Sequence, residues 1–401
     1  MTSTPGETTA AAALSTAYRD LQPRSAYDIG GTPTGLAAEA PSVRAEAARG
    51  AEPLGLTYSY LEFLPGWFVY LPVIIQWFAL GFWHRDLSLP TAANPRIRTG
   101  GLCGERKTEI LDIAGPTARA WIAPYTTLTT GTDDLPRALA SLTTAGLALP
   151  VVLKPDIGCN GTGVRLIRTE ARLAETLAAY PRDTDLVLQQ FVALPEEAGI
   201  FYIRHPDAKA GHISSITLKT PPTVTGDGTR TLRALIDADP RHHRLKHLYL
   251  PHLAPRLDTV PARNETIPLV FAGNHCKGSI FSNGATEITP ALTARIDAIA
   301  RDLPDFHFGR LDVRFESLSA LRSGESFRII EVNGVGSEAT HIWDPTTTLR
   351  TIWSDQLRHY AAAWSIAAAL RRRGARTSGL RPMARDWFTQ LRLMESYPPN
   401  D

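Results

Sequence analysis

The chain has 401 residues, of which 43% are hydrophobic and 20% charged, so it is long enough to form more than one packed subdomain. Its 42 basic and 40 acidic residues leave a formal net charge of +2, which provides no broad basic surface for nucleic acid. Cys103, Cys159 and Cys276 are too widely spaced for a disulfide framework or a Cys-x-x-Cys metal knuckle, and we expect a reducing, cytoplasmic setting.

The first part of the chain, residues 1–53, is rich in Ala, Thr, Ser, Gly and Pro and has little apolar periodicity. This composition predicts a disordered arm, because such a segment cannot bury enough apolar surface to fold. Arg19 and Arg24 interrupt it and no compact apolar run follows the start, so it is not a secretory signal. The functional chain is expected to start near Leu54.

A hydrophobic segment of 21 residues runs from Phe63 to Trp83 and carries no charge, with Gln76 as its only strongly polar side chain. As one helix it would measure about 30 Å, the thickness of the hydrocarbon core of a membrane. Pro72 removes a backbone hydrogen bond, which predicts a kinked or split helix and favours a bent hairpin. Three interpretations stay open: an interfacial or re-entrant membrane anchor, a true membrane span, and a buried core helix or partner-binding patch.

A glycine-rich hairpin follows, between residues 148 and 168. A buried strand ends at Lys154, a loop contains Gly158, Gly161 and Gly163, and a second strand returns. Glycines let backbone N–H groups approach phosphate oxygens, and a lysine at the strand end supplies a positive charge. The pattern matches neither a Walker A loop nor a dinucleotide-binding fingerprint, and by itself it could be only a turn.

Two apolar strands near the C-terminal end each carry polar residues at alternate positions. The first contains Arg310 and Asp312, and the second contains Glu331 and Asn333. A period of two places each pair on one face of a strand, so neighbouring strands would bring three oxygen ligands and a guanidinium together. Such a set suits a hard cation such as Mg²⁺, and the alternative for either pair alone is a structural salt bridge or a solvated face.

Taken in this order and spacing, the elements resemble the ATP-grasp superfamily, particularly its D-alanine:D-alanine ligase branch, over about 240 residues. The resemblance implies an α/β (α+β) fold with two lobes whose mixed or antiparallel sheets clasp ATP, preceded here by the hydrophobic helical segment. It also implies two Mg²⁺ ions, with Mn²⁺ as an alternative, and a homodimer. The site residues that it implies fall into four groups: Lys107 and Lys154 on the phosphates with the loop glycines Gly158, Gly161 and Gly163; Gln190, Phe191 and Val192 at adenine with Glu197 at the ribose; Lys219 and Arg310 as catalytic cations; and Asp312, Glu331 and Asn333 as metal ligands.

A narrower resemblance lies in residues 222–241, which are similar to a stretch of cyanophycin synthetases and related amide-forming ligases. Gly226 and Gly228 flank Asp227 in what should be a tight turn, and a helix should follow it. We expect this turn and helix in the lobe that covers ATP.

The family resemblance implies that a carboxylate is activated as an acyl phosphate and coupled to an amine. The alternatives are a carboxylate:thiol ligase of the same family and a membrane-anchored scaffold that binds ATP without turnover. The substrate side departs from the family, because residues 334–345 replace its Pro-Gly turn. Ser337, Glu338, Thr340 and His341 are therefore candidates to face the acceptor, and the small-molecule substrates stay open, lipidic ones included.

The predicted organisation has four parts: a disordered arm at 1–53, the hydrophobic segment with a reduced N-terminal substrate region at 54–104, an ATP-grasp domain at 105–350, and a C-terminal helix and tail at 351–401. The last helix should run from about Thr347 to Arg373. We expect a cytoplasmic protein held peripherally or monotopically at the inner face of a membrane.

Overall fold

The computed structural model describes residue 61, residues 64–271 and residues 278–398. The chain divides into two units, Met1–Gly55 and Leu56–Asp401, and all described residues belong to the second. The predicted disordered arm at 1–53 lies outside the described residues. The predicted boundaries at residues 104 and 350 stay a prediction.

Within the described residues, eleven strands form three sheets, and every strand pair is antiparallel. The five-stranded sheet has the order β11-β10-β5-β6-β9, the four-stranded sheet β1-β4-β2-β3, and the small sheet β7-β8. The strands are β1 (Tyr125–Thr129), β2 (Val151–Pro155), β3 (Arg165–Ile167), β4 (Asp185–Gln190), β5 (Glu196–Ile203), β6 (His212–Thr220), β7 (Thr223–Thr225), β8 (Thr266–Pro268), β9 (Ile280–Asn283), β10 (Phe308–Phe315) and β11 (Phe327–Asn333).

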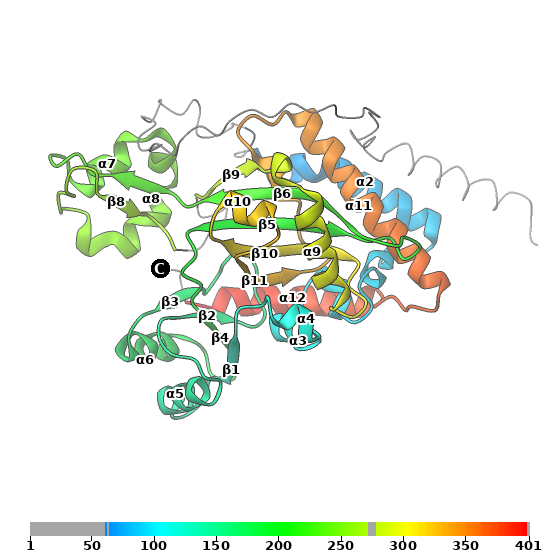
Figure 1. Cartoon of the computed structure of the whole chain (residues 1–401), viewed down its shortest axis with the longest axis horizontal. Coiled ribbons are helices and arrows are strands. Elements are labelled where there is room, and N and C mark those ends of the chain that lie inside the picture. Colours follow the sequence, from blue (N-terminus) through cyan, green and yellow to red (C-terminus); the bar gives the residue numbers. More distant parts are fainter. Residues whose placement is uncertain (1–60, 62–63, 272–277, 399–401) are drawn as a thin grey trace, which may run out of the picture. The chain divides into compact units, whose positions relative to one another are not determined.

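Helices connect and cover these sheets (Figure 1). The α-helices are α2 (Gly66–His84), α3 (Lys107–Asp112), α4 (Pro116–Arg119), α5 (Asp134–Thr144), α6 (Glu170–Ala179), α7 (Leu232–Ala238), α8 (Pro240–Leu253), α9 (Pro290–Arg301), α10 (Leu318–Arg322), α11 (Leu349–Arg372) and α12 (Leu380–Ser396). Short 3-10 turns are η2 (Leu89–Ala92), η3 (Arg98–Gly101), η4 (Ala254–Arg256), η6 (Ala285–Glu287) and η7 (Thr340–Trp343). The predicted class, helices with antiparallel sheets and an apolar helix near the N-terminus, is confirmed.

Several predicted elements appear where the sequence places them. Strands β2 and β3 form the glycine-tipped hairpin, and α7 follows the turn at Asp227. The last predicted helix is α11, where Thr348 accepts a hydrogen bond from the backbone N–H of Thr351 as the N-cap.

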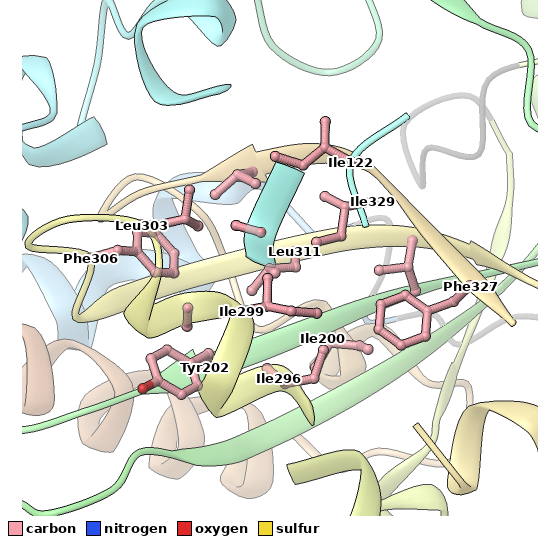
Figure 2. Close-up of a cluster of buried hydrophobic side chains, with 14 of the residues drawn as sticks. Ile122, Ile200, Tyr202, Ile296, Ile299, Leu303, Phe306, Leu311, Phe327 and Ile329 are labelled. Carbon is pink, nitrogen blue, oxygen red and sulfur yellow. The ribbon is translucent and has the colours of Figure 1, made fainter. Parts of the chain in front are cut away.

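The largest hydrophobic cluster lies on one face of the five-stranded sheet, under α9. Figure 2 shows Ile200 and Tyr202 of β5 and Leu311 of β10 directed toward Ile296 and Ile299 of α9. The opposite face packs on α11, where its apolar side chains join a second cluster around Trp364. Successive β10 residues alternate between these faces. Leu311 therefore enters the first cluster, while Phe308 enters the second and Arg310 and Asp312 share the face of Phe308.

Helix α2 is one continuous helix of 19 residues with Pro72 inside it, so the predicted bent hairpin is wrong. Pro72 removes a single early hydrogen bond, and packing along α11 supports the turns on either side. Val69 and Val73 are buried, the Trp77 ring lies 5.3 Å from that of Trp364, and Gln76 donates to Leu357 O at 2.9 Å. Among the described residues, α2 is the one helix long and apolar enough to cross a membrane.

Candidate active site

Asp312 is the centre of a buried charge cluster on the five-stranded sheet. Its Oδ1 accepts hydrogen bonds from Lys219 Nζ and Arg310 Nε, both at 3.0 Å. Its Oδ2 accepts from Arg310 Nη2 and Asn333 Nδ2, both at 3.2 Å. Burial opposes ionisation, but Arg310 and Lys219 hold the pKa of Asp312 below its usual value. The carboxylate is therefore ionised at neutral pH.

The strand register explains why these residues meet. In the antiparallel pair of β10 and β11, Asp312 lies opposite Glu331 and Arg310 lies opposite Asn333. Directly opposite residues point to the same face of a sheet, so the predicted convergence of the two strands is confirmed. On the other side of β10, Gly199 of β5 lies opposite Asp312. A Cβ at Gly199 would come within 3.1 Å of Asp312 Oδ1, so this glycine makes room for the carboxylate.

Lys219 links Asp312 to Glu197. Lys219 Nζ donates to Glu197 Oε1 at 3.0 Å, and the two residues lie opposite each other on β6 and β5. Burial disfavours the charged amine, but Asp312 and Glu197 raise the pKa of Lys219 above its usual value. Glu197 is thus engaged with Lys219 in this structure, and its contact with a ribose stays a prediction.

Lys154 connects the four-stranded sheet to strand β11, which carries part of this charge cluster. Its Nζ donates to Gln189 Oε1 of β4 and to Ile330 O of β11, both at 2.8 Å. Burial lowers the pKa of Lys154 to about 8, although Glu331 opposes the shift. Gln189 also donates to Ala123 O at 3.2 Å, which fixes its amide. The sequence-based prediction was Gln190, but the buried side chain that orients Lys154 is that of its neighbour Gln189.

Lys107 reaches the cluster from the start of α3. Its Nζ lies 3.5 Å from Glu331 Oε1 and donates to Gly158 O of the glycine-rich loop at 2.8 Å. Asp156, which was not among the predicted site residues, fixes this arrangement. Its carboxylate accepts from the N–H and hydroxyl of Thr108, and its backbone carbonyl accepts from the N–H of Lys107.

The glycine-rich loop between β2 and β3 is supported by helix α12. Tyr397, just after α12, donates to Ile157 O at 2.9 Å, and Cys159 Sγ lies 3.5 Å from Met394 Sδ. Gly161 and Gly163 have φ values of +67° and +73°, a region that favours glycine. The structure thus places Gly158, Gly161 and Gly163 in one loop, as predicted. It also brings Lys107 to this loop and packs α12 against it, neither of which the sequence indicated.

The predicted adenine segment lies at the end of β4. The backbone N–H of Gln190 donates to Pro124 O at 2.8 Å, and that of Phe191 donates to Pro150 O at 3.3 Å. The ring centroid of Phe191 lies 6.2 Å from that of Phe271, and Val192 is buried. Adenine contact by these three residues stays a prediction.

Glu338 connects the cluster to the apolar helix α2. Its carboxylate accepts from Tyr70 of α2, from Trp343 Nε1 at 2.6 Å and from Gln356 Nε2 of α11 at 3.2 Å. Its backbone carbonyl accepts from Arg310 Nη1 at 2.9 Å. Glu338 is therefore a bridge between α2 and Arg310, a role that the sequence could not indicate because Tyr70 is 268 residues away.

The other three acceptor candidates also have partners within the chain. Ser337 donates to Gly334 O at 2.5 Å and is buried, Thr340 donates to Thr217 Oγ1 at 3.0 Å, and His341 Nε2 lies 3.0 Å from Asp355 Oδ2. Glu105, which was not among the predicted site residues, accepts from the N–H of Gly334 at 3.3 Å, and burial raises its pKa to about 7. The turn after Asn333 is thus fixed from several sides.

The cluster combines Lys107, Lys154, Lys219 and Arg310 with the predicted ligands Asp312, Glu331 and Asn333. Among the described residues, no group of three or more His, Cys, Asp or Glu side chains could hold a metal ion. The predicted set has two carboxylates and one amide, which is too few for a complete protein shell. Such a set suits a cation that is also bound by phosphate oxygens and water.

No family model and no curated protein sequence matches the chain. Among solved structures, it is similar to a bifunctional glutathione synthetase from Pasteurella multocida, with 17% identity, a TM-score of 0.35, and coverage of 62% of this chain and 35% of that one. It is similar to the VanG D-Ala:D-Ser ligase from Enterococcus faecalis, with 14% identity, a TM-score of 0.38, and coverage of 67% and 63%. It is also similar to a D-alanine–D-alanine ligase from Bacillus anthracis, with 15% identity, a TM-score of 0.38, and coverage of 69% and 70%.

Proposed function

We propose that this chain is an ATP-grasp ligase that forms ADP and an acyl phosphate from ATP and a carboxylate, and then joins the acyl group to an amine. The main support for this proposal is the strand register, which places Asp312 opposite Glu331. Lys219 and Arg310 donate hydrogen bonds to Asp312. Lys154 and Lys107 reach this pair from outside the five-stranded sheet. In this proposal the four cationic side chains bind the phosphates of ATP, and the two facing carboxylates bind a divalent cation.

The donor set fits Mg²⁺. Asp312, Glu331 and Asn333 would hold it, since Asp312 lies opposite Glu331 and Asn333 lies two positions further along the same strand as Glu331. When bound, the ion supplies charge neutralisation on the transferred phosphoryl group. Two ions, and Mn²⁺ in place of Mg²⁺, belong to the same proposal.

The residues of the chain position the reactants and neutralise charge. In the first step an oxygen of the substrate carboxylate bonds to the γ-phosphorus, the bond to the ADP oxygen breaks, and an acyl phosphate forms. In the second step the amine nitrogen bonds to the acyl carbon, phosphate leaves and the nitrogen loses a proton. Lys107 and Lys154 bind phosphates, and Arg310 stabilises the transferred charge from its fixed position between Asp312 and Glu338 O.

The test is a screen of carboxylic acids paired with amines for ADP formation, with thiols as a separate set. We expect ADP to form only with Mg²⁺ or Mn²⁺ present and to depend on both an acid and an amine. Turnover with thiols in place of amines would show that the chain is a carboxylate:thiol ligase instead. ATP binding without ADP formation in any pairing would replace the ligase by an ATP-binding scaffold.

We also propose that α2 lies on the inner face of a membrane. It carries no charged residue, and its face away from α11 exposes large apolar side chains, with Trp67 67%, Phe82 79% and Trp83 60% exposed. Tryptophans near both ends favour the headgroup region of a bilayer. Because α11 covers the other face of α2, a helix lying in the interface fits better than one that crosses the bilayer.

This membrane proposal predicts the behaviour of a double variant, Ile75→Asp with Phe82→Asp. Both side chains are exposed, so the fold should persist while apolar contact with lipid is lost. We expect the wild-type protein to float with vesicles in a density gradient and the double variant to stay in solution. The control, Val260→Asp with Leu318→Asp, alters exposed apolar residues elsewhere and should float normally. Equal flotation of all three proteins, or a wild-type dimer that the double variant dissociates, would contradict membrane binding through α2.

A further inference from the structure

Two tyrosines hold the two ends of the glycine-rich loop between β2 and β3. Tyr397, just after α12, donates to the carbonyl oxygen of Ile157 at the start of the loop, at 2.9 Å. Tyr180, just after α6, donates to the carbonyl oxygen of Gly163 at the other end. Both side chains are buried, with Tyr180 6% and Tyr397 8% exposed. Side chains from outside the hairpin thus fix the loop at both ends.

The two tyrosines also contact each other, with their ring centroids 5.8 Å apart. Both belong to the hydrophobic cluster of the four-stranded sheet, together with Leu153 of β2 and Ile167 of β3. The ring of Tyr397 lies against the loop, since a Cβ at Gly158 would come within 3.7 Å of its Cε2. Burial raises the pKa of Tyr397 to about 12, so its hydroxyl keeps the proton that it donates at neutral pH. The pair is therefore anchored in the core of this sheet.

Helix α12 is anchored on the segment that precedes α3. Asp386 of α12 is buried and accepts from Arg98 Nε and Nη2, both at 2.7 Å. The Gln390 side chain of the same helix accepts from the N–H of Gly104 at 2.6 Å, and its Nε2 lies 3.5 Å from Cys159 Sγ in the loop. The helix that places Tyr397 thus connects the start of α3 with the glycine-rich loop.

The middle of this loop carries backbone donors that the chain leaves available. Among the described residues, none accepts a hydrogen bond from the N–H groups of Gly158, Cys159 and Asn160. Cys159 and Asn160 are exposed, and Lys107 Nζ lies beside them, where it donates to Gly158 O at 2.8 Å. Backbone N–H groups next to a lysine suit phosphate oxygens. The tyrosines hold the ends of the loop, and its middle stays open to a ligand.

We propose that Tyr397 and Tyr180 are positioning residues, which hold the glycine-rich loop in the conformation that binds the phosphates of the nucleotide. This inference rests on the proposed ATP site and adds the side chains that keep its loop in place. Both hydroxyls act through loop carbonyls, so they need no contact with the nucleotide. A loop with several glycines has many accessible conformations, and only the molecules with the competent one bind. Fixing the loop beforehand therefore strengthens nucleotide binding.

The test removes each hydroxyl and keeps its ring, with Tyr397→Phe, Tyr180→Phe and the double variant in the full-length protein. The probe is adenylyl imidodiphosphate, a nonhydrolysable ATP analogue, titrated by calorimetry with Mg²⁺. We expect each single variant to bind about threefold to tenfold more weakly, and the double variant more weakly still, because each lost hydrogen bond lowers the competent fraction. With the acid and amine that the screen identifies, the KM for ATP should rise while kcat changes by less than about twofold.

The matched control is Tyr202→Phe. Tyr202 is also buried, and its hydroxyl donates to Asp297 Oδ1 at 2.6 Å in the cluster under α9. The same substitution there removes a comparable hydrogen bond and costs comparable stability, but it lies on the face of β5 away from the charge cluster. We expect this variant to bind the analogue within about twofold of wild type, since the loop keeps both of its anchors.

Cys159 supplies a readout that needs no nucleotide. Its Sγ lies between the loop and α12, 3.5 Å from both Met394 Sδ and Gln390 Nε2. Iodoacetamide labelling, followed by mass spectrometry of the peptide that contains Cys159, reports how often the loop leaves α12. We expect the double variant to be labelled at least about threefold faster than wild type, and Tyr202→Phe at the wild-type rate.

The proposal is overturned if the double variant matches wild type in either the titration or the labelling, or if Tyr202→Phe weakens binding as much as the double variant does. Failure of the wild-type protein to bind the analogue would overturn the ATP site and this inference together. Binding of the analogue without ADP formation in any pairing would overturn only the ligase reaction, so the two failures are distinct.

Discussion

Replacing Asp312 by Asn should reduce ADP formation about a hundredfold to a thousandfold, the effect of removing a major electrostatic contributor from a transition state. The substitution keeps the shape of the side chain but removes the charge that Lys219 and Arg310 surround. The measurement is ADP formation per folded molecule with the acid and amine that the screen identifies. Calorimetric titration with Mn²⁺ in the presence of an ATP analogue supplies a readout that does not depend on turnover.

The matched control for this variant is Asp305→Asn, just before β10. Asp305 pairs with Arg96 at an exposed position and has a φ of +57°, which asparagine tolerates. The Asp305→Asn variant carries the same substitution, Asp to Asn, close in the chain but outside the charge cluster around Asp312. We expect ADP formation within twofold of wild type for Asp305→Asn, and a similar value for Asp312→Asn would remove the central support for the proposed site.

The second large effect concerns the opposite face of the same strand. Leu311 lies between Arg310 and Asp312, is 0% exposed and packs in the cluster of Figure 2. Leu311→Ala should lower the free energy of unfolding by about 2–5 kcal/mol, because apolar burial is lost and a cavity is left. Urea unfolding followed by circular dichroism measures this change.

The two variants of β10 should separate stability from chemistry. At low temperature, where Leu311→Ala is still folded, its ADP formation per folded molecule should stay near that of wild type. Arg328→Ala on the neighbouring strand β11 removes an exposed side chain and should change stability by less than about 0.5 kcal/mol. A loss of turnover in Leu311→Ala that matches the loss in Asp312→Asn would show that β10 is not held as the register describes.

The sequence alone determined which polar residues share a face on each of the two strands of the proposed site. Alternation with period two placed Arg310 with Asp312 and Glu331 with Asn333 on single faces, since this property depends only on local backbone geometry. The same local reasoning placed the glycines in a hairpin tip. These predictions held because each depends on residues close together in the chain.

Local reasoning failed where a partner from a distant segment decides the outcome. Pro72 should break an isolated helix, yet α2 continues through it along α11. Glu338 was an acceptor candidate, and the structure ties it to Tyr70, Trp343 and Gln356 instead. Both differences involve the packing of α2 on α11, since Tyr70 belongs to α2 and Gln356 to α11, and no sequence period encodes this packing.

The sequence therefore determined which charged residues lie in each strand and loop of this protein, and which face of a strand they occupy. Only the tertiary structure decided which of them meet: Lys154 donates to Ile330 O, and Lys107 lies beside Glu331. It also places Gly199 opposite Asp312, where there is room for the carboxylate. The physical reason is that side-chain direction follows from backbone geometry over a few residues. Contacts between segments far apart in the chain form only when hydrophobic faces pack and fix the register between them.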